Sequence, residues 1–144
     1  MKVAEIKISY SSKNSNKFKI QNSADAYNLV AEKWNKDLIE LQEEMKVILL
    51  NRANMVLGIF ELSKGGTNST VVDVKLLVSV ALKCNAHGII MCHNHPSGNL
   101  KASKADIEIT NKVKKACSYF DMVLLDHLII TKGEHLSFAD EGLL

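Results

Sequence analysis

Two histidines one residue apart, His93 and His95, stand directly before Pro96, the only proline of the chain, and Asp106 follows eleven residues after His95. Side chains two residues apart on a strand point to the same side, so a strand that ends at the proline would present both imidazoles together. A catalytic zinc ion takes three protein ligands and one water. The segment therefore predicts a divalent metal site that needs a third ligand.

Asp106 is the candidate for the missing ligand. The helix that we expect over residues 103–120 carries an apolar stripe, and Asp106 continues this stripe because it lies three residues before Ile109. Its side chain should therefore point toward the sheet, where a carboxylate is costly unless a cation or several hydrogen-bond donors meet it. A second interpretation is open, since Ser103-x-x-Asp106 also matches a capping box with Ser103 as the N-cap.

Apolar periodicity and turn residues predict the elements that position these groups. Strands are expected over residues 3–10, 45–50, 55–62, 88–93, 122–125, 127–131 and 135–138, with the pair 122–125 and 127–131 either separate or one bent strand. Helices are expected over residues 23–37, capped by Ser23 with Trp34 in the core, over 73–84, stopped by Gly88, and over 103–120. This order predicts an α/β fold of the mixed α+β kind, a mixed β-sheet flanked by helices. Residues 1–22 are expected to form an N-terminal strand and polar leader, and residues 23–144 the domain.

Composition narrows the classes of function. The 144 residues, 47% of them hydrophobic, suit one soluble domain, and no apolar run reaches the roughly 20 residues of a membrane helix. The first ten residues carry charges where a signal peptide would be apolar, and three cysteines without a CxxC spacing favour free thiols in a reducing compartment. We therefore expect a cytoplasmic protein. Arg52 is the only arginine, which argues against sequence-specific reading of DNA.

The conjunction of these residues resembles a known motif. His93-x-His95, seven residues, Ser103, two residues and Asp106 make the HxH-x7-S-x2-D pattern of the JAMM metalloproteins, also called the MPN or JAB family. The segments HNHPSG, LLDHLII, KGEHLSF and NRANMVLGIFELSKGG resemble its RadC-like branch, and the likeness runs from about residue 24 to the end. The resemblance implies a JAB/MPN-like layered architecture, similar to that of cytidine deaminases, and a Zn²⁺ ion bound by His93, His95 and Asp106.

The resemblance also implies two groups beside the metal. Ser103 would supply a hydroxyl that helps to hold the tetrahedral intermediate, and a glutamate just before the strand at 45–50 would be the general base. The matching residue is Glu43, with Glu44 as its competitor. If the strand pattern extends back, Glu43 shares the face of Met45 and Glu44 points away. The plain alternative for Glu43 is a solvated charge at a helix end.

These implications predict a zinc-dependent metallohydrolase, a metallopeptidase or isopeptidase of the JAMM type, that cleaves a peptide or isopeptide bond in an unidentified peptide or protein substrate. The alternative is a non-catalytic binding module associated with DNA-repair or mobile-element machinery, because the RadC name is linked historically to DNA repair. DNA is the weaker candidate partner, and no membrane partner is expected.

Three features of this sequence depart from the RadC-like pattern, and the role of one histidine has two interpretations. Ala102 stands where RadC-like chains usually have proline, and Val72-Asp73-Val74 stands where they tend to have His-Pro, so loop shape and substrate preference can differ. Longer relatives carry an N-terminal helix-hairpin-helix region linked with DNA, and here we expect only a short leader. His127 could orient a ligand histidine, but we interpret it as a packed strand residue.

Overall fold

A five-stranded mixed sheet forms the centre of the domain. The computed structural model describes residues 1–7, 9–12, 16–65 and 71–144. The strands lie in the order β2-β1-β3-β4-β5, with bounds β1 (Glu44–Leu50), β2 (Val56–Lys64), β3 (Gly88–Asn94), β4 (Val123–Ile130) and β5 (His135–Ser137). The neighbours β3 and β4 are parallel, and the other neighbouring pairs are antiparallel. The mixed α/β fold predicted from the sequence is therefore confirmed.

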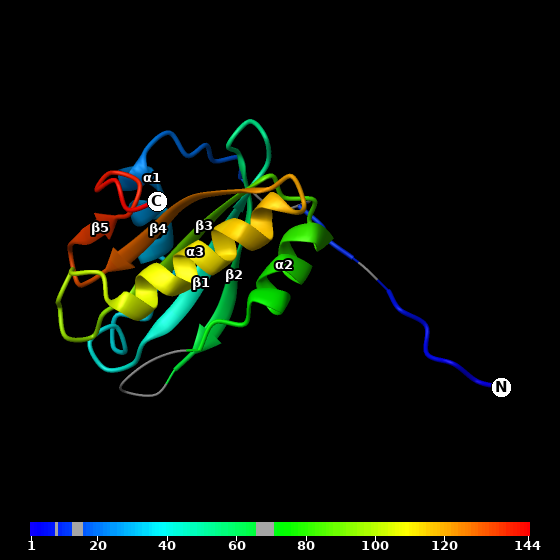
Figure 1. Cartoon of the computed structure of the whole chain (residues 1–144), viewed down its shortest axis with the longest axis horizontal. Helices are drawn as coiled ribbons and strands as arrows, with labels where there is room; N and C mark the ends of the chain where they lie inside the picture. Colours follow the sequence, from blue (N-terminus) through cyan, green and yellow to red (C-terminus); the bar gives the residue numbers. More distant parts are fainter. Residues whose placement is uncertain (8, 13–15, 66–70) are drawn as a thin grey trace.

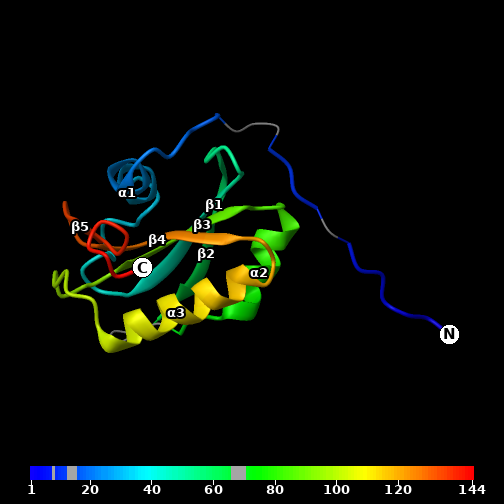
Figure 2. The same cartoon turned by 45° about the horizontal axis from the view of Figure 1, so that its top comes forward.

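Helices cover both faces of the sheet, as Figures 1 and 2 show. Helices α2 (Val74–Lys83) and α3 (Lys104–Ser118) lie on one face, and α1 (Ser23–Ala31) lies on the other. Because β3 and β4 are parallel, the chain must cross back from the end of β3 to the start of β4, and α3 provides this crossover. The first turn of α3 is thereby brought beside the end of β3.

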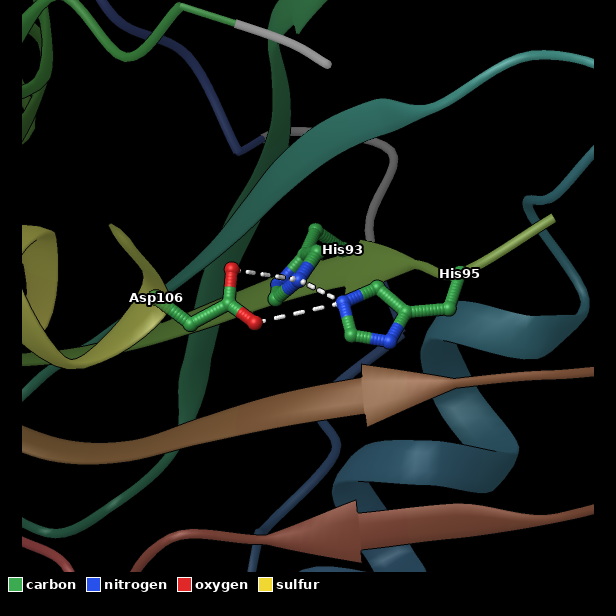
Figure 3. Close-up of side chains that lie close together, drawn as sticks. All are labelled: His93, His95 and Asp106. Carbon is green, nitrogen blue, oxygen red and sulfur yellow. Dashed lines mark hydrogen bonds and ion pairs between the residues drawn. The ribbon is translucent and has the colours of Figure 1, made fainter. Parts of the chain in front are cut away.

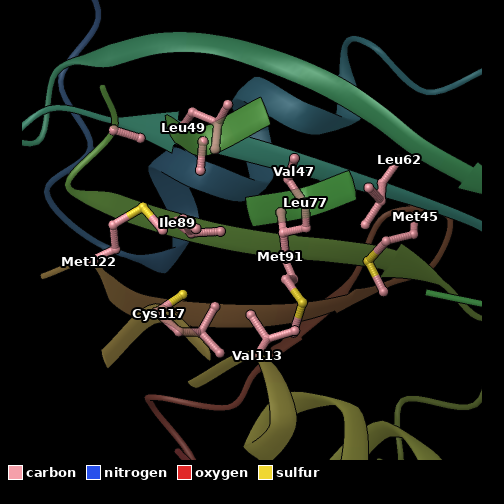
Figure 4. Close-up of a cluster of buried hydrophobic side chains, with 13 residues drawn as sticks. Met45, Val47, Leu49, Leu62, Leu77, Ile89, Met91, Val113, Cys117 and Met122 are labelled. Atoms are coloured by element: carbon pink, nitrogen blue, oxygen red, sulfur yellow. The ribbon is translucent and has the colours of Figure 1, made fainter. Parts of the chain in front are cut away.

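Alternation along the central strands builds a core on each face. From β1, Met45, Val47 and Leu49 join the cluster beneath α2 and α3 (Figure 4), whereas Ile48 and Leu50 join the cluster beneath α1. Both β1 and β3 are buried over their whole length, which explains their nearly continuous apolar sequences. Each fully buried Leu, Ile or Met side chain stabilises the fold by roughly 1.5–3 kcal/mol. The burial of β1 and β3 therefore holds the residues at their ends in fixed positions.

The first helix is shorter than the sequence predicts. Asn22, not Ser23, is its N-cap, because the Asn22 side chain accepts a hydrogen bond from the Asp25 N–H at 2.9 Å. The helix ends at Ala31 instead of near residue 37, and in the turns that follow the Trp34 N–H donates to the Ala31 carbonyl. These turns carry Trp34 into the core, where it is 4% exposed, so its predicted burial is confirmed.

The predicted strand at residues 3–10 is wrong. The described part of this segment, residues 3–7 and 9–10, forms no strand, and Val3 and Ile6 are exposed. Further along, Lys19 forms an isolated bridge with Met55 at the start of the β1–β2 return. Alternating apolar residues favour a strand only where a sheet edge pairs with them and a surface buries them, and residues 1–7 extend away from the sheet (Figure 1).

The other elements lie close to their predicted positions. β4 is one strand, which is one of the two alternatives expected, and its pairing with β3 shifts by one residue at Leu125. Asn85, at φ 55°, lies just beyond the end of α2, so the helix stops before Gly88, which begins β3. A Cβ at Gly88 would lie 2.6 Å from Leu125 Cδ1, so a larger residue there would force the Leu125 side chain to move. Among the residues described, none of the helices has the length and apolar character needed to cross a membrane.

Candidate metal centre

The end of β3 and the first turn of α3 bring together three side chains of the kinds that can bind metals (Figure 3). His93 lies on β3, His95 follows the strand, and Asp106 belongs to α3. The two histidine Nε2 atoms are 2.9 Å apart; His93 Nε2 lies 3.2 Å from Asp106 Oδ1, and His95 Nε2 lies 3.2 Å from Asp106 Oδ2. One ligand atom from each residue lies within 4.8 Å of the others. The three side chains therefore form a cluster that could hold a metal ion.

Both interpretations of Asp106 hold at once. Ser103 Oγ accepts a hydrogen bond from the Asp106 N–H at 3.0 Å, and Asp106 Oδ2 accepts one from the Ser103 N–H at 2.8 Å, which completes a capping box. The same carboxylate is buried and faces the two histidines. The helix cap therefore holds the carboxylate in the orientation that the cluster needs.

The donor set of the cluster fits a divalent cation. His95 Nδ1 lies 2.5 Å from the Asn99 carbonyl oxygen, which can only accept, so Nδ1 carries the hydrogen and Nε2 presents a lone pair to the cluster. Ligand atoms at about 2.0–2.2 Å from a tetrahedral zinc ion are about 3.3 Å apart, and the corresponding spacings here are 2.9 and 3.2 Å. Lone pairs and negative charge that converge in this way are stabilised by a cation between them.

The electrostatics of the cluster also favour a cation. Burial opposes the ionisation of Asp106, but its side-chain contacts with His93 and His95 outweigh burial and hold the pKa of Asp106 well below its ordinary value. The same contact with Asp106 raises the pKa of His95. Asp106 is therefore an anion at physiological pH, and a positive charge held by the imidazoles or bound between them balances it.

A pocket of about 610 Å³ adjoins the cluster. Glu43, directly before β1, lines this pocket with Ser103 and the three clustered side chains. Burial raises the pKa of Glu43, and the nearby charges of His93 and His95 partly offset the increase. The Glu43 carboxylate is therefore a stronger base than an exposed glutamate and lies beside the candidate metal position.

Glu44, the competing glutamate, faces away from the pocket. It is 2% exposed, and its carboxylate lies 3.3 Å from Lys46 Nζ. Lys46 also lies over the Trp34 ring, 5.0 Å from its centroid, on the α1 side of the sheet. Successive residues of a strand face opposite sides, so only one of the two glutamates reaches the pocket, and it is Glu43.

His127 does more than the packing that the sequence suggested. It stacks on Phe138 with 4.6 Å between ring centroids, and its Nε2 lies 2.7 Å from His93 Nδ1. Its Nδ1 lies 2.7 Å from Thr110 Oγ1. Burial and the neighbouring His93 lower the pKa of His127 well below its ordinary value. Sequence reasoning missed Thr110, although it follows Asp106 by one helical turn and so lies on the same face of α3.

Comparisons with known proteins cover nearly the whole domain. The family model of the RadC-like JAB domain matches residues 20–143. A UPF0758 protein of Flavobacterium johnsoniae is 45% identical over 126 residues, which cover 87% of this chain and 53% of that protein. A UPF0758 protein of Porphyromonas gingivalis is 46% identical over 104 residues, 72% of this chain and 46% of that protein, and one of Clostridium tetani is 38% identical over 134 residues, 92% and 57% respectively.

The chain thus spans about half the length of the curated relatives it matches. The match of the family model covers more than four fifths of the chain, and it includes both histidines, Ser103 and Asp106. The chain belongs to the RadC-like JAB domain family.

Proposed function

We propose that this chain is a zinc-dependent hydrolase that cleaves a peptide or isopeptide bond, with His93, His95 and Asp106 as the metal ligands. The observation that carries the proposal is that the three ligand groups converge beside a pocket which also contains Glu43. A structural zinc site fills four positions with protein ligands, whereas a catalytic site uses three and leaves one for water or substrate. In the described part of the chain, the cluster has three members.

Glu43 is proposed as the general base. Zinc in this site would supply Lewis acidity, which lowers the pKa of water to about 7 and polarises a carbonyl group. The Glu43 carboxylate takes a proton from the attacking water and then gives it to the nitrogen of the departing amine. The proton thus passes to the product, and Glu43 returns to its starting state after each turnover.

Ser103 is proposed as a hydrogen-bond donor to the reacting carbonyl oxygen. Its Oγ already accepts from the Asp106 N–H, so the hydroxyl hydrogen can be directed into the pocket that Ser103 lines. Negative charge develops on the carbonyl oxygen as water attacks, and a donor aimed at this oxygen is worth about 10²–10³ in kcat.

A peptide or protein is the substrate class that the pocket suits best. Met45, Val72 and Ile109 contribute apolar surface, and Asn99 and Lys101 contribute polar groups. An amide bond next to an apolar side chain would find both kinds of contact here, in line with the general build of ligand sites.

The test is to compare two matched variants, Glu43→Gln and Glu44→Gln, in protein purified without chelator. Zinc content is measured first, and hydrolysis is then measured on a panel of peptide and isopeptide substrates. We expect both variants to retain zinc. We expect Glu43→Gln to lose about 10²–10⁴-fold in hydrolysis because it cannot accept a proton, and Glu44→Gln to stay near wild type because Glu44 lies outside the pocket.

Equal hydrolysis by Glu43→Gln and wild type would remove Glu43 from the mechanism. Wild-type protein that binds zinc stoichiometrically and hydrolyses nothing in the panel, while it binds DNA with an affinity unchanged by Asp106→Ala, would support a binding module in place of the hydrolase.

A further inference from the structure

A closed ring of contacts joins the candidate metal cluster to the interior of the domain. His93 Nε2 faces Asp106 Oδ1 at 3.2 Å, and His93 Nδ1 faces His127 Nε2 at 2.7 Å. His127 Nδ1 lies 2.7 Å from Thr110 Oγ1, and Thr110 Oγ1 lies 2.6 Å from the Asp106 backbone carbonyl oxygen. The ring starts and ends on Asp106, and its members come from β3, β4 and α3.

The direction of each hydrogen bond in this ring follows from its last member. The Asp106 carbonyl oxygen can only accept, so the Thr110 hydroxyl must donate to it. If the hydroxyl turned toward His127 instead, two oxygens 2.6 Å apart would face each other without a hydrogen between them. Thr110 Oγ1 therefore accepts from His127, and the His127 hydrogen lies on Nδ1.

The same argument continues to the cluster. A neutral His127 with its hydrogen on Nδ1 has a bare Nε2, which must accept from His93. His93 Nδ1 then carries a hydrogen, and in neutral His93 the lone pair of Nε2 points toward His95 and Asp106. A neutral imidazole free in water prefers the opposite arrangement, with its hydrogen on Nε2, and that hydrogen would occupy the metal position.

We propose that Thr110 and His127 are positioning residues that fix the hydrogen of His93 on Nδ1 and so keep its Nε2 available to a divalent cation. This inference rests on the metal site of the proposed function. The Asn99 carbonyl does the same for His95. Loss of a partner that orients a metal-ligating histidine commonly lowers metal affinity about 10–100-fold.

The burial of the ring explains why a defined orientation persists. His127 is fully buried and Thr110 is 1% exposed, so water cannot replace either partner. His127 also stacks on Phe138, which holds the plane of its ring. A buried hydrogen-bonded network in which each group has its partner is rigid, and the loss of one member leaves a costly unpaired group.

The experiment compares Thr110→Val, which keeps the shape and removes the hydroxyl, with Thr110→Ser, which restores the hydroxyl. Ser137→Ala is the matched control, because Ser137 is also buried but donates to Asp126 at 2.5 Å and not to an imidazole. Zinc affinity is measured by competition with a chelator. Ring-nitrogen chemical shifts of ¹⁵N-labelled histidine give the position of the His127 hydrogen in zinc-free wild-type protein. Thermal unfolding of the zinc-free proteins reports the stability of each variant.

We expect a hydrogen on Nδ1 and a bare Nε2 for His127 in the wild type. We expect Thr110→Val to weaken zinc binding about 10–100-fold, and Thr110→Ser and Ser137→Ala to stay within about threefold of wild type, which is less than the effect of a lost orienting partner. A His127 hydrogen on Nε2 in the wild type would overturn the proposal. So would Thr110→Val that unfolds at a lower temperature but binds zinc as tightly as wild type, because the role would then be structural.

Failure of the proposed hydrolase can be told apart from failure of this inference. Zinc affinity and the nitrogen shifts need no substrate, so they keep their meaning if no peptide is cleaved. If the wild type binds no zinc, the metal site itself fails, and the nitrogen shifts of His127 still decide whether the ring has the inferred direction.

Discussion

Two buried aspartates of this domain, Asp106 and Asp126, have opposite relations to the groups around them. Asp126, on β4, has hydrogen bonds to both carboxylate oxygens: Oδ1 accepts from the backbone N–H groups of His127 and Ala139 at 2.7 and 3.0 Å, and Oδ2 accepts from Ser137 Oγ at 2.5 Å. All of these donors belong to β4, β5 or the segment just after β5. Folding alone satisfies this carboxylate.

Asp106 is arranged differently. Among the described residues, its one backbone donor is the Ser103 N–H, and its other side-chain contacts are to the Nε2 atoms of His93 and His95. Both imidazoles have their other nitrogen committed to a partner, His127 and Asn99 respectively. The difference indicates that a buried carboxylate with fixed donors on both oxygens is structural, whereas one that faces two imidazoles marks a candidate site for a cation.

The largest effect expected from this contrast concerns metal affinity. Asp106→Asn removes the anionic group of the candidate metal site but keeps an oxygen for the helix cap, so the fold should persist. We expect zinc affinity to fall by more than about 100-fold, beyond the range seen for residues that only orient ligands. Competition with a chelator measures the affinity, and circular dichroism checks the fold. Near-wild-type affinity in this variant would break the contrast.

The reciprocal substitution should act on stability. Asp126→Asn replaces one accepting oxygen by an amide, so at least one of the three donors loses its partner or faces another N–H. We expect a loss of about 1–3 kcal/mol in the free energy of unfolding, with zinc affinity within about threefold of wild type, below the range expected for an orienting residue. Urea unfolding of the zinc-free protein measures the loss. A variant with full stability and impaired zinc binding would reverse the two assignments.

The smallest expected effect is a pH dependence in chelator-treated protein. The lowered pKa of Asp106 contributes stability that is present above its unfolded value of about 3.9 and is lost as pH falls through the folded value. The raised pKa of His95 contributes stability that is complete below its unfolded value of about 6.5 and is lost as pH rises through the folded value. Asp106→Asn should therefore destabilise the zinc-free protein most between about pH 4 and 6.5.

Urea unfolding gives the free energies of unfolding of zinc-free Asp106→Asn and wild type. We compare them at about pH 5.5, inside this window, and at about pH 9, outside it. Burial raises the pKa of Asp126, although its three donors partly offset the effect. We expect Asp106→Asn to lose less stability at alkaline pH than at acidic pH. Asp126→Asn should not show this recovery of stability at alkaline pH. The same recovery in both variants would mean that the His95–Asp106 pair does not cause it.

Several parts of the site could be predicted because they depend on local geometry. The two-residue period of a strand places His93 and His95 on one side, and the helical period places Asp106 on the stripe of Ile109. The strand period also separates Glu43 from Glu44. The choice between a capping box and an inward carboxylate could not be made from the sequence, because Asp106 uses Oδ2 for the cap while both oxygens face the histidines.

The two wrong predictions, a strand at residues 3–10 and a first helix that continues to about residue 37, have one cause. Both depend on tertiary contacts that the sequence pattern does not reveal. Residues 3–10 alternate like a strand, but the described part of that segment forms none. The first helix ends at Ala31, and the turns that follow place Trp34 in the core. Both outcomes depend on which surfaces the rest of the domain offers, and local propensity carries no information about them.

By itself, the sequence determined the types and spacing of the candidate ligands, and the periods of two and 3.6 residues indicated which face of each element carries them. Only the tertiary structure decided that His127 contacts His93. The parallel register of β3 and β4 pairs His93 with Ile129 and Met91 with His127, so His127 becomes the diagonal neighbour of His93 on the same face of the sheet. Register between strands separated by a helix depends on the packing of the whole domain, and for that reason this partner appears only once the chain has folded.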